Sequence, residues 1–266
     1  MTSLPEIWIF DIDGVITDPS TKTITSPRIL RLIEQKLADK IPVFFNTGRS
    51  SEWVQKEIIP HFDPKISLEQ LFTVCEMGNL TLEFNQDNSP QEIVVNRNLI
   101  PPQLESTIRD IVQSSYGDSM FVDETKKTIL TIEMKDNYAQ ALYEELQSKL
   151  SGEIRIILKN YHPGIHVRPS SSNIAIDVKP IDSNKALGIT QVLSWLKAKK
   201  ITLSEYLFVA FGDSTSDLQM SEFLESEGLH TKFVYVGGDD LNVNPPYPLV
   251  KTKLHFTQGT LEYLES

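Results

Sequence analysis

The chain has little cysteine, no long apolar run and no cluster of basic residues. Its 266 residues include a single cysteine, Cys75, so an intrachain disulfide is excluded, which fits a reducing compartment. No run of about eighteen apolar residues is present to span a bilayer, and the N-terminal residues lack the basic and apolar segments of a secretory leader. We therefore expect a cytoplasmic protein with no membrane partner.

The acidic balance of the chain argues against a nucleic-acid partner. Asp and Glu number 36 against 25 Lys and Arg, which gives a formal charge of −11, whereas a polyanion is held mainly by clustered basic residues. A small phosphorylated molecule remains compatible, because one lysine, backbone amides and a divalent cation can reverse the local field of a single site. A length of 266 residues predicts about two domains, and a hydrophobic content of 40% is enough for buried cores. No heptad pattern identifies a partner subunit, so the oligomeric state stays open.

Three apolar segments end in small polar or acidic residues. Buried parallel strands are continuous apolar runs, and open α/β sheets place their sites at the carboxyl ends of such strands. A lysine, Lys185, opens an amphipathic segment near the third of them. The polar residues in question are Asp11 and Asp13 after a strand at 6–11, Thr47 and Gly48 after a strand at 42–46, and Asp213 and Asp217 after a strand at 206–211. We expect these residues to share one crevice.

The two ends of the chain alternate between strand and helix patterns, which is typical of a doubly wound parallel sheet. The middle of the chain instead shows paired short strands separated by two helices, which favours an antiparallel sheet with helices on one face. The sequence thus predicts an α/β fold with an inserted α+β domain. The expected outer elements are strands at 6–11, 42–46, 71–76, 206–211, 232–236 and 253–256 with helices at 26–39, 50–60, 184–199 and 215–225; the inserted elements are strands at 80–84, 91–95, 120–123, 128–134, 153–158, 164–168 and 173–178 with helices at 101–115 and 137–150.

In order along the chain, these segments resemble the haloacid dehalogenase-like hydrolase superfamily. The family pattern is Asp-x-Asp-Gly, a strand ending in Thr or Ser, a Lys, and Gly-Asp followed by a second Asp. The middle segment, introduced by Glu76-Met77-Gly78, is similar to the larger cap of the subgroup that includes trehalose-phosphate phosphatases, sucrose-phosphate phosphatases and phosphomannomutase. The resemblance implies a Rossmann-like core over residues 1–78 and 181–266 and a cap over residues 79–180.

The resemblance also implies a chemistry. Asp11 would attack phosphorus to give an aspartyl-phosphate, and Asp13 would act as acid and then base. The carboxylates of Asp11 and Asp213, with the backbone carbonyl of Asp13 and the support of Asp217, would hold Mg²⁺. Phosphate-binding groups would be Thr47, Gly48 and Lys185. The expected function is magnesium-dependent hydrolysis of a small phosphorylated sugar or related metabolite.

Five further residues are expected to contact the substrate. Arg49 follows Thr47 and Gly48, and Glu124 and Lys126 are similar to a Glu-x-Lys strand entry of trehalose-phosphate phosphatases. His166 and Arg168 would share one strand face. The following His-Tyr-Arg of those enzymes is not matched, because this chain has Glu, Met and Lys at 133–135.

Alternatives remain open for the residues and for the function. Each polar residue has an ordinary structural interpretation as a turn acid, a helix cap, a solvated helical lysine or a hairpin charge. The same Asp pair would also serve a phosphomutase, which returns the phosphoryl group to the sugar, or a non-catalytic phospho-acceptor module. The second acid, Asp13, argues against simple storage of phosphate, because an adjacent base promotes its loss.

Overall fold

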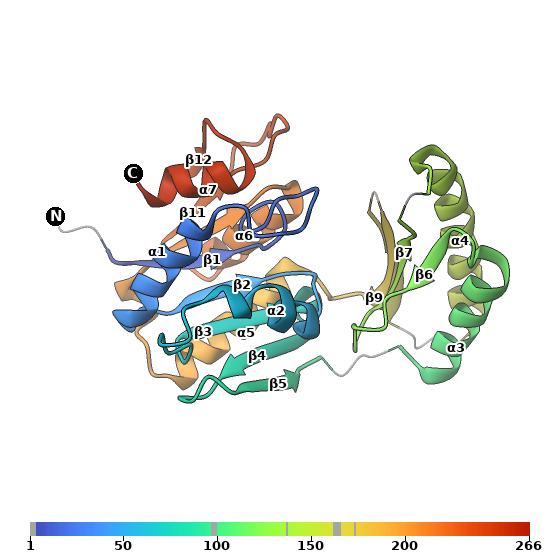
Figure 1. Cartoon of the computed structure of the whole chain (residues 1–266), viewed down its shortest axis with the longest axis horizontal. Helices are drawn as coiled ribbons and strands as arrows, with labels where there is room; N and C mark the ends of the chain where they lie inside the picture. The colour runs from blue at the N-terminus through green and yellow to red at the C-terminus, as the bar shows by residue number, and fades with distance from the viewer. Residues whose placement is uncertain (1–3, 97–99, 137, 162–165, 173) are drawn as a thin grey trace. The chain divides into compact units, whose positions relative to one another are not determined.

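The computed structural model describes residues 4–96, 100–136, 138–161, 166–172 and 174–266 (Figure 1). The chain divides into two compact units, one formed by residues 1–95 and 184–266 and the other by residues 96–183. Within the described residues, no helix has both the length and the apolar character needed to cross a membrane.

An eight-stranded mixed sheet forms the centre of the first unit. Its strand order is β12-β11-β10-β1-β2-β3-β4-β5, and all neighbours from β12 to β3 are parallel, while β4 and β5 are antiparallel additions. The strands are β1 (Glu6–Phe10), β2 (Val43–Asn46), β3 (Leu71–Cys75), β4 (Leu80–Phe84), β5 (Pro90–Val94), β10 (Leu207–Gly212), β11 (Thr231–Tyr235) and β12 (Leu249–Lys251).

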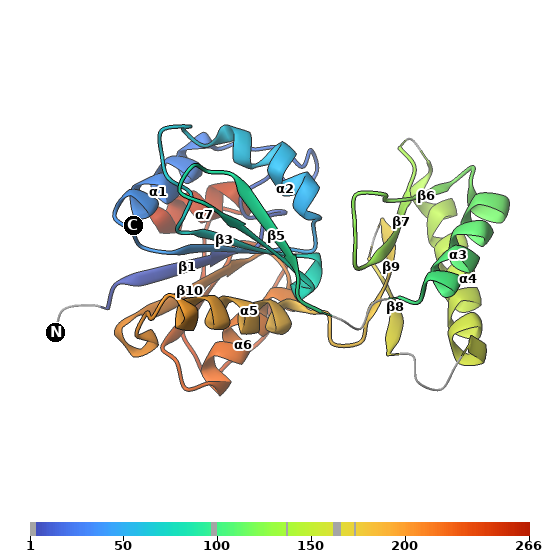
Figure 2. The same cartoon turned by 90° about the horizontal axis from the view of Figure 1, so that it is seen from below.

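Helices cover both faces of this sheet, which explains why its central strands are continuous apolar runs. Figure 2 shows α1 (Pro27–Ala38), α2 (Ser51–Glu57) and α7 (Phe256–Leu264) on one face and α5 (Lys185–Ala198) and α6 (Leu218–Ser226) on the other. Strand β1 serves both layers, because Trp8 and Phe10 pack on the α1 side while Ile7 and Ile9 pack on the α5 side. Its carboxyl end is thereby fixed between two apolar cores.

The second unit is a four-stranded antiparallel sheet with helices on one face. Its order is β6-β7-β9-β8, from β6 (Met120–Val122), β7 (Leu130–Met134), β8 (Val167–Ser171) and β9 (Ala175–Pro180). Helices α3 (Pro102–Ile111) and α4 (Gln140–Tyr161) pack against it through one apolar cluster. Short helical segments complete the chain: 3₁₀ turns at Ile59–His61, Glu76–Gly78, Leu203–Glu205 and Thr215–Asp217, and a π-helical segment at Val112–Tyr116.

The predicted fold class is confirmed, but several predicted elements are wrong. The strand predicted at 153–158 is part of α4, because Tyr143, Leu150 and Ile154 recur at helical spacing and bury one face of a single long helix. The strand predicted near 253–256 forms instead at Leu249–Lys251. Residues 164 and 165 of the strand predicted at 164–168 lie outside the described residues.

The boundary between the units also differs from the expected one. The inserted domain was predicted to span residues 79–180, whereas the second compact unit spans 96–183. Strands β4 and β5 account for the difference at the first crossing, because β4 pairs with β3 and β5 pairs with β4. The strands predicted at 80–84 and 91–95 thus extend the core sheet.

Candidate active site

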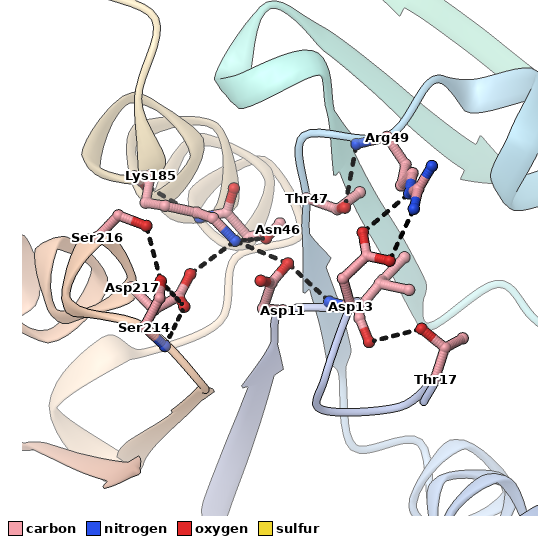
Figure 3. Close-up of polar contacts among 11 residues, drawn as sticks. Asp11, Asp13, Thr17, Asn46, Thr47, Arg49, Lys185, Ser214, Ser216 and Asp217 are labelled. Atoms are coloured by element: carbon pink, nitrogen blue, oxygen red, sulfur yellow. Dashed lines mark hydrogen bonds and ion pairs between the residues drawn. The ribbon is translucent and has the colours of Figure 1, made fainter. Parts of the chain in front are cut away.

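The carboxyl ends of three neighbouring parallel strands hold the polar residues singled out in the sequence. Strands β10, β1 and β2 lie side by side, so the residues that follow them meet at one edge of the sheet. Asp11 follows β1, Thr47 follows β2 and Asp213 follows β10, while Lys185 begins α5. Figure 3 shows how residues from these segments converge.

Three carboxylates form an acidic group at this edge. Asp11, Asp213 and Asp217 each offer an oxygen, and these oxygens all lie within 4.8 Å of one another. Two glycines make room for them. A Cβ on Gly14, whose φ is +72°, would lie 2.1 Å from an oxygen of Asp213, and a Cβ on Gly212 would lie 2.2 Å from the Cβ of Asp217. Glycine is therefore required at position 14 both by its positive φ and by the close approach of Asp213.

Lys185 is buried between two of these acids. Its Nζ lies 2.8 Å from Asp11 Oδ1 and 2.8 Å from Asp217 Oδ1, and it donates to the backbone carbonyl of Asn46 at 2.7 Å (Figure 3). The lysine side chain is only 4% exposed. Asn184 caps α5 by accepting from the Leu187 amide at 2.8 Å, which fixes where the helix starts. The ordinary interpretation of Lys185 as a solvated helical lysine is wrong.

Burial and the mutual repulsion of the carboxylates change the pKa values of the acidic group and of Lys185. Burial raises the pKa of Asp11 to about 8 against the opposing charge of Lys185, and the charges of Asp217 and Asp13 act in the same direction as burial. Burial, with the nearby charge of Asp217, likewise raises the pKa of Asp213 to about 6. Burial alone would lower the pKa of Lys185, but Asp11 and Asp217 raise it above its usual value. The acids exceed the positive charge available to them.

Asp13 is held apart from the acidic group by Arg49. Arg49 Nε and Nη2 donate to the two Asp13 oxygens at 2.8 and 2.9 Å, and Lys22 Nζ lies 3.8 Å from the same carboxylate. Strand β1 ends at Phe10, so Asp13 lies on a loop and its side chain points toward Arg49 (Figure 3). Burial would raise the pKa of Asp13, but the hydrogen bonds and charge of Arg49 lower it below its ordinary value.

Thr47 and Gly48 lie at the end of β2 as expected. Thr47 is fully buried, and its hydroxyl accepts from the Arg49 amide at 3.1 Å. A Cβ on Gly48 would come within 2.9 Å of the Met77 side chain, so this turn leaves no room for a larger residue without movement. Thr47 does not cap α2, because the N-cap is Ser50, whose hydroxyl accepts from the Trp53 amide.

Asp217 is fully buried and is organised by a local hydrogen-bond network. Its Oδ2 accepts from the Ser214 hydroxyl at 2.7 Å and from the Ser214 amide at 3.1 Å, which forms a capping box at the start of the turn before α6. The other oxygen faces Lys185. Asp217 therefore combines the structural role of a first-turn acid with a place in the acidic group.

The residues expected from the inserted domain belong to the second compact unit. Glu124 pairs with Arg109 at 2.6 Å, and Lys126 Nζ lies 3.7 Å from an oxygen of Asp177. His166 and Arg168 are both exposed, and only Arg168 lies within strand β8. Substrate contact by these four residues stays a prediction.

Two contributors to the site were missed in the sequence. Asn46 is fully buried at the end of β2, where its backbone carbonyl accepts from Lys185 and its side-chain amide donates to the Lys185 carbonyl at 2.9 Å. A Cβ on Gly188 would lie 2.2 Å from Asn46 Oδ1, so Gly188 allows α5 to approach this side chain. A polar Asn closing an apolar strand directly before Thr47 was the available signal for Asn46.

Comparison with known proteins identifies the fold. No family model matches the sequence, and no curated protein matches it significantly. Solved structures match over nearly the whole chain. The C-terminal domain of trehalose-6-phosphate phosphatase from C. albicans superposes with a TM-score of 0.70 at 16% identity, covering 98% of this chain and 91% of that chain. A haloacid dehalogenase-like hydrolase from Bacteroides thetaiotaomicron gives 0.68 at 15% identity, covering 98% of both chains. The fold is that of the haloacid dehalogenase-like hydrolases.

A third match extends the same result. A trehalose-6-phosphate phosphatase related protein superposes with a TM-score of 0.62 at 16% identity, covering 97% of this chain and 95% of that chain. Both units of the present chain are thus included in the likeness. At these identities the haloacid dehalogenase-like fold is shared, and the chemistry has to be argued from the residues of this chain.

Proposed function

We propose that the protein is a Mg²⁺-dependent phosphatase that hydrolyses a small phosphorylated sugar or related metabolite. The observation that supports this most is the placement of Asp11 beside the buried Lys185, within 4.8 Å of oxygens from Asp213 and Asp217. A carboxylate nucleophile, a fixed cation for phosphate oxygens and a set of oxygen ligands are the parts that phosphoryl transfer to a carboxylate requires.

The donor set fits a magnesium ion. Mg²⁺ prefers oxygen ligands and binds through few carboxylates while keeping water. The raised pKa values of Asp11 and Asp213 indicate carboxylates that lack compensating positive charge, which a divalent cation would supply. Asp11 and Asp213 would hold the ion with the backbone carbonyl of Asp13, and Asp217 would support them. The bound ion would neutralise charge on the phosphate and favour the ionised form of Asp11.

The first chemical step belongs to Asp11 and Asp13. An oxygen of ionised Asp11 attacks phosphorus, the bond from phosphorus to the ester oxygen breaks, and an aspartyl-phosphate forms. Asp13 in its protonated form gives its proton to the leaving oxygen. Arg49 holds Asp13 in the ionised form in the present arrangement, so the acid role requires that this pair opens when substrate binds.

The second step regenerates the enzyme. Asp13, now ionised, takes a proton from water as the water oxygen attacks phosphorus, and the bond to the Asp11 oxygen breaks to release phosphate. Lys185 stabilises negative charge on Asp11 and on the phosphate oxygens, and the buried Thr47 hydroxyl and the Gly48 amide are the proposed hydrogen-bond donors. The carboxylate of Asp217 holds Lys185 in place through their 2.8 Å ion pair.

A phosphatase screen tests the proposal. Purified protein is assayed for phosphate release from p-nitrophenyl phosphate and from a panel of sugar phosphates, with Asp11→Asn as the inactive variant. Asp110→Asn, at an exposed acid on α3, is the matched control. Turnover by the wild type and the control but not by Asp11→Asn supports the proposal. Phosphate release that survives Asp11→Asn would show that another group attacks phosphorus.

A further inference from the structure

The sheet of the second unit has one apolar face and one polar face. Leu130, Ile132, Ile176 and Val178 belong to the cluster that packs under α3 and α4. Side chains alternate along a strand, so their neighbours in sequence point away from the helices. These neighbours and their cross-strand partners are Thr131 and Glu133 on β7, Asp177 and Lys179 on β9, and Arg168 and Ser170 on β8.

Three cations gather on this polar face. Arg168 lies directly opposite Lys179 in the β8–β9 register, and Lys126 reaches the same place from the segment before β7. Two acids share this face: Asp177, two residues from Lys179 on β9, and Glu133, two residues from Thr131 on β7. Lys126 Nζ lies 3.7 Å from Asp177 Oδ1, which also accepts from the Thr131 hydroxyl at 2.6 Å.

Lys179 is the most buried of the three cations. The residue is only 7% exposed, and in the described part of the chain its Nζ makes no hydrogen bond or ion pair. Burial lowers its pKa against the pull of Asp177, and the charges of Arg168 and Lys126 lower it further. An ammonium that is largely withdrawn from water beside two like charges is costly unless an anion accompanies it.

We propose that Lys126, Arg168 and Lys179 form a binding site for the phosphate or carboxylate group of a small metabolite. An anion there would accept hydrogen bonds from Lys179 and Arg168 and would balance the excess of these three cations over Asp177 and Glu133. Surface lysines that serve only solubility are not buried to this degree. The cluster also differs from the acidic group after β1 and β10, where carboxylates exceed the cations.

The bound anion has two possible sources. If it belongs to the substrate, an inference that rests on the proposed phosphatase function, the leaving group carries a second anionic group. If it is a separate small anion, it acts as an effector. In both cases the bound group is a phosphate or a carboxylate. Thermal unfolding tests whether the site binds an anion, and kinetics then distinguish the two sources.

Thermal unfolding of the full chain tests the site without requiring catalysis. Inorganic phosphate is added in excess EDTA. Without a metal ion, the carboxylates of Asp11, Asp213 and Asp217 repel phosphate from the first unit, so the measurement reports on the proposed site. Lys179→Met keeps the volume of the stem and removes the charge, and Arg168→Gln is a second variant at an exposed position where folding is not at risk. Lys159→Met, an exposed lysine on α4, is the matched control.

A ligand that binds only the folded state raises its unfolding temperature. Wild type and Lys159→Met should gain stability with phosphate, while Lys179→Met and Arg168→Gln should lose most of that gain. Lys179→Met should itself unfold no earlier than wild type in the absence of phosphate, because it removes an uncompensated buried charge. An undiminished phosphate gain in both Lys179→Met and Arg168→Gln overturns the proposal.

Kinetics then separate the two sources. Glycerol phosphate and 3-phosphoglycerate share a skeleton and differ in a hydroxyl against a carboxylate. A loss of about 10- to 100-fold in kcat/KM for 3-phosphoglycerate in Lys179→Met, with glycerol phosphate unchanged, would assign the anion to the substrate. Unchanged kinetics together with a lost phosphate gain would assign it to a separate anion. Absent turnover of p-nitrophenyl phosphate and of every sugar phosphate in the panel would sink the phosphatase proposal and leave the unfolding test intact.

Discussion

Replacing Lys185 by methionine should damage both stability and catalysis. The change keeps an unbranched side chain of similar length and removes the charge that lies 2.8 Å from Asp11 and 2.8 Å from Asp217. Two buried carboxylates are then left without their shared counter-ion, and the Asn46 carbonyl loses its 2.7 Å donor. Removing one partner of a buried ion pair costs about 3–5 kcal/mol of folding free energy.

The expected loss lies toward the lower end of that range. The pKa of Asp11 is raised to about 8 even beside Lys185 and should rise further without it, so near neutral pH this carboxyl is protonated in the metal-free variant and leaves no unpaired charge. Because the pKa of Lys185 is raised in the folded state, its stabilisation is present throughout the neutral range and is lost only as pH rises through that raised value. Urea unfolding near pH 7 should therefore show Lys185→Met about 3 kcal/mol less stable than wild type.

The loss of activity in Lys185→Met should be larger than its lower folding stability alone would cause. Removing one group that stabilises transition-state charge in a dry site lowers the rate by about 10²- to 10³-fold. Lys197→Met, at an exposed lysine of the same helix, is the matched control and should leave both measurements unchanged. Wild-type unfolding and wild-type kcat/KM on p-nitrophenyl phosphate in Lys185→Met would refute the role assigned to this lysine.

Three further outcomes follow from the site. Excess EDTA should stop phosphate release and added Mg²⁺ should restore it, and full activity in EDTA would contradict the proposed magnesium requirement. Gly188→Ala places a Cβ 2.2 Å from Asn46 Oδ1 and should lower the free energy of unfolding in urea by about 1–3 kcal/mol; an unchanged value would show that α5 can shift freely. Arg49→Met removes the group that lowers the pKa of Asp13 in the free enzyme, so the loss of kcat/KM on an alkyl phosphate with rising pH should move to higher pH. An unmoved profile would exclude Asp13 as the titrating acid.

The sequence was most informative where chemistry and secondary structure coincide. An apolar run that ends in Asp, Thr or Gly-Asp indicates both a buried parallel strand and the end at which polar groups gather, and Asp11, Thr47 and Asp213 lie at the predicted strand ends. The alternation of elements was sufficient to predict a doubly wound sheet with an insertion. Each of these inferences depends on local pattern, which a single sequence displays directly.

Features set by tertiary contacts were harder to predict. The segment at 153–158 is apolar enough for a strand, and only its packing with Tyr143 and Leu150 makes it the end of a long helix. Strands β4 and β5 join the core sheet because β4 pairs with β3 and β5 pairs with β4. No residue pattern in the sequence shows this pairing. The two-point pairing of Arg49 with Asp13 likewise joins residues from two different loops.

Trapping the covalent intermediate shows whether phosphate is transferred to Asp11 during turnover. Enzyme turning over a phosphate ester with Mg²⁺ is quenched in acid and treated with borohydride, which reduces an acyl phosphate on an aspartate to homoserine, and the peptide that contains Asp11 is analysed by mass spectrometry. The account predicts homoserine at position 11 in wild type, and none in Asp11→Asn or in enzyme without substrate. Sustained phosphate release with no modified residue at position 11 would contradict it.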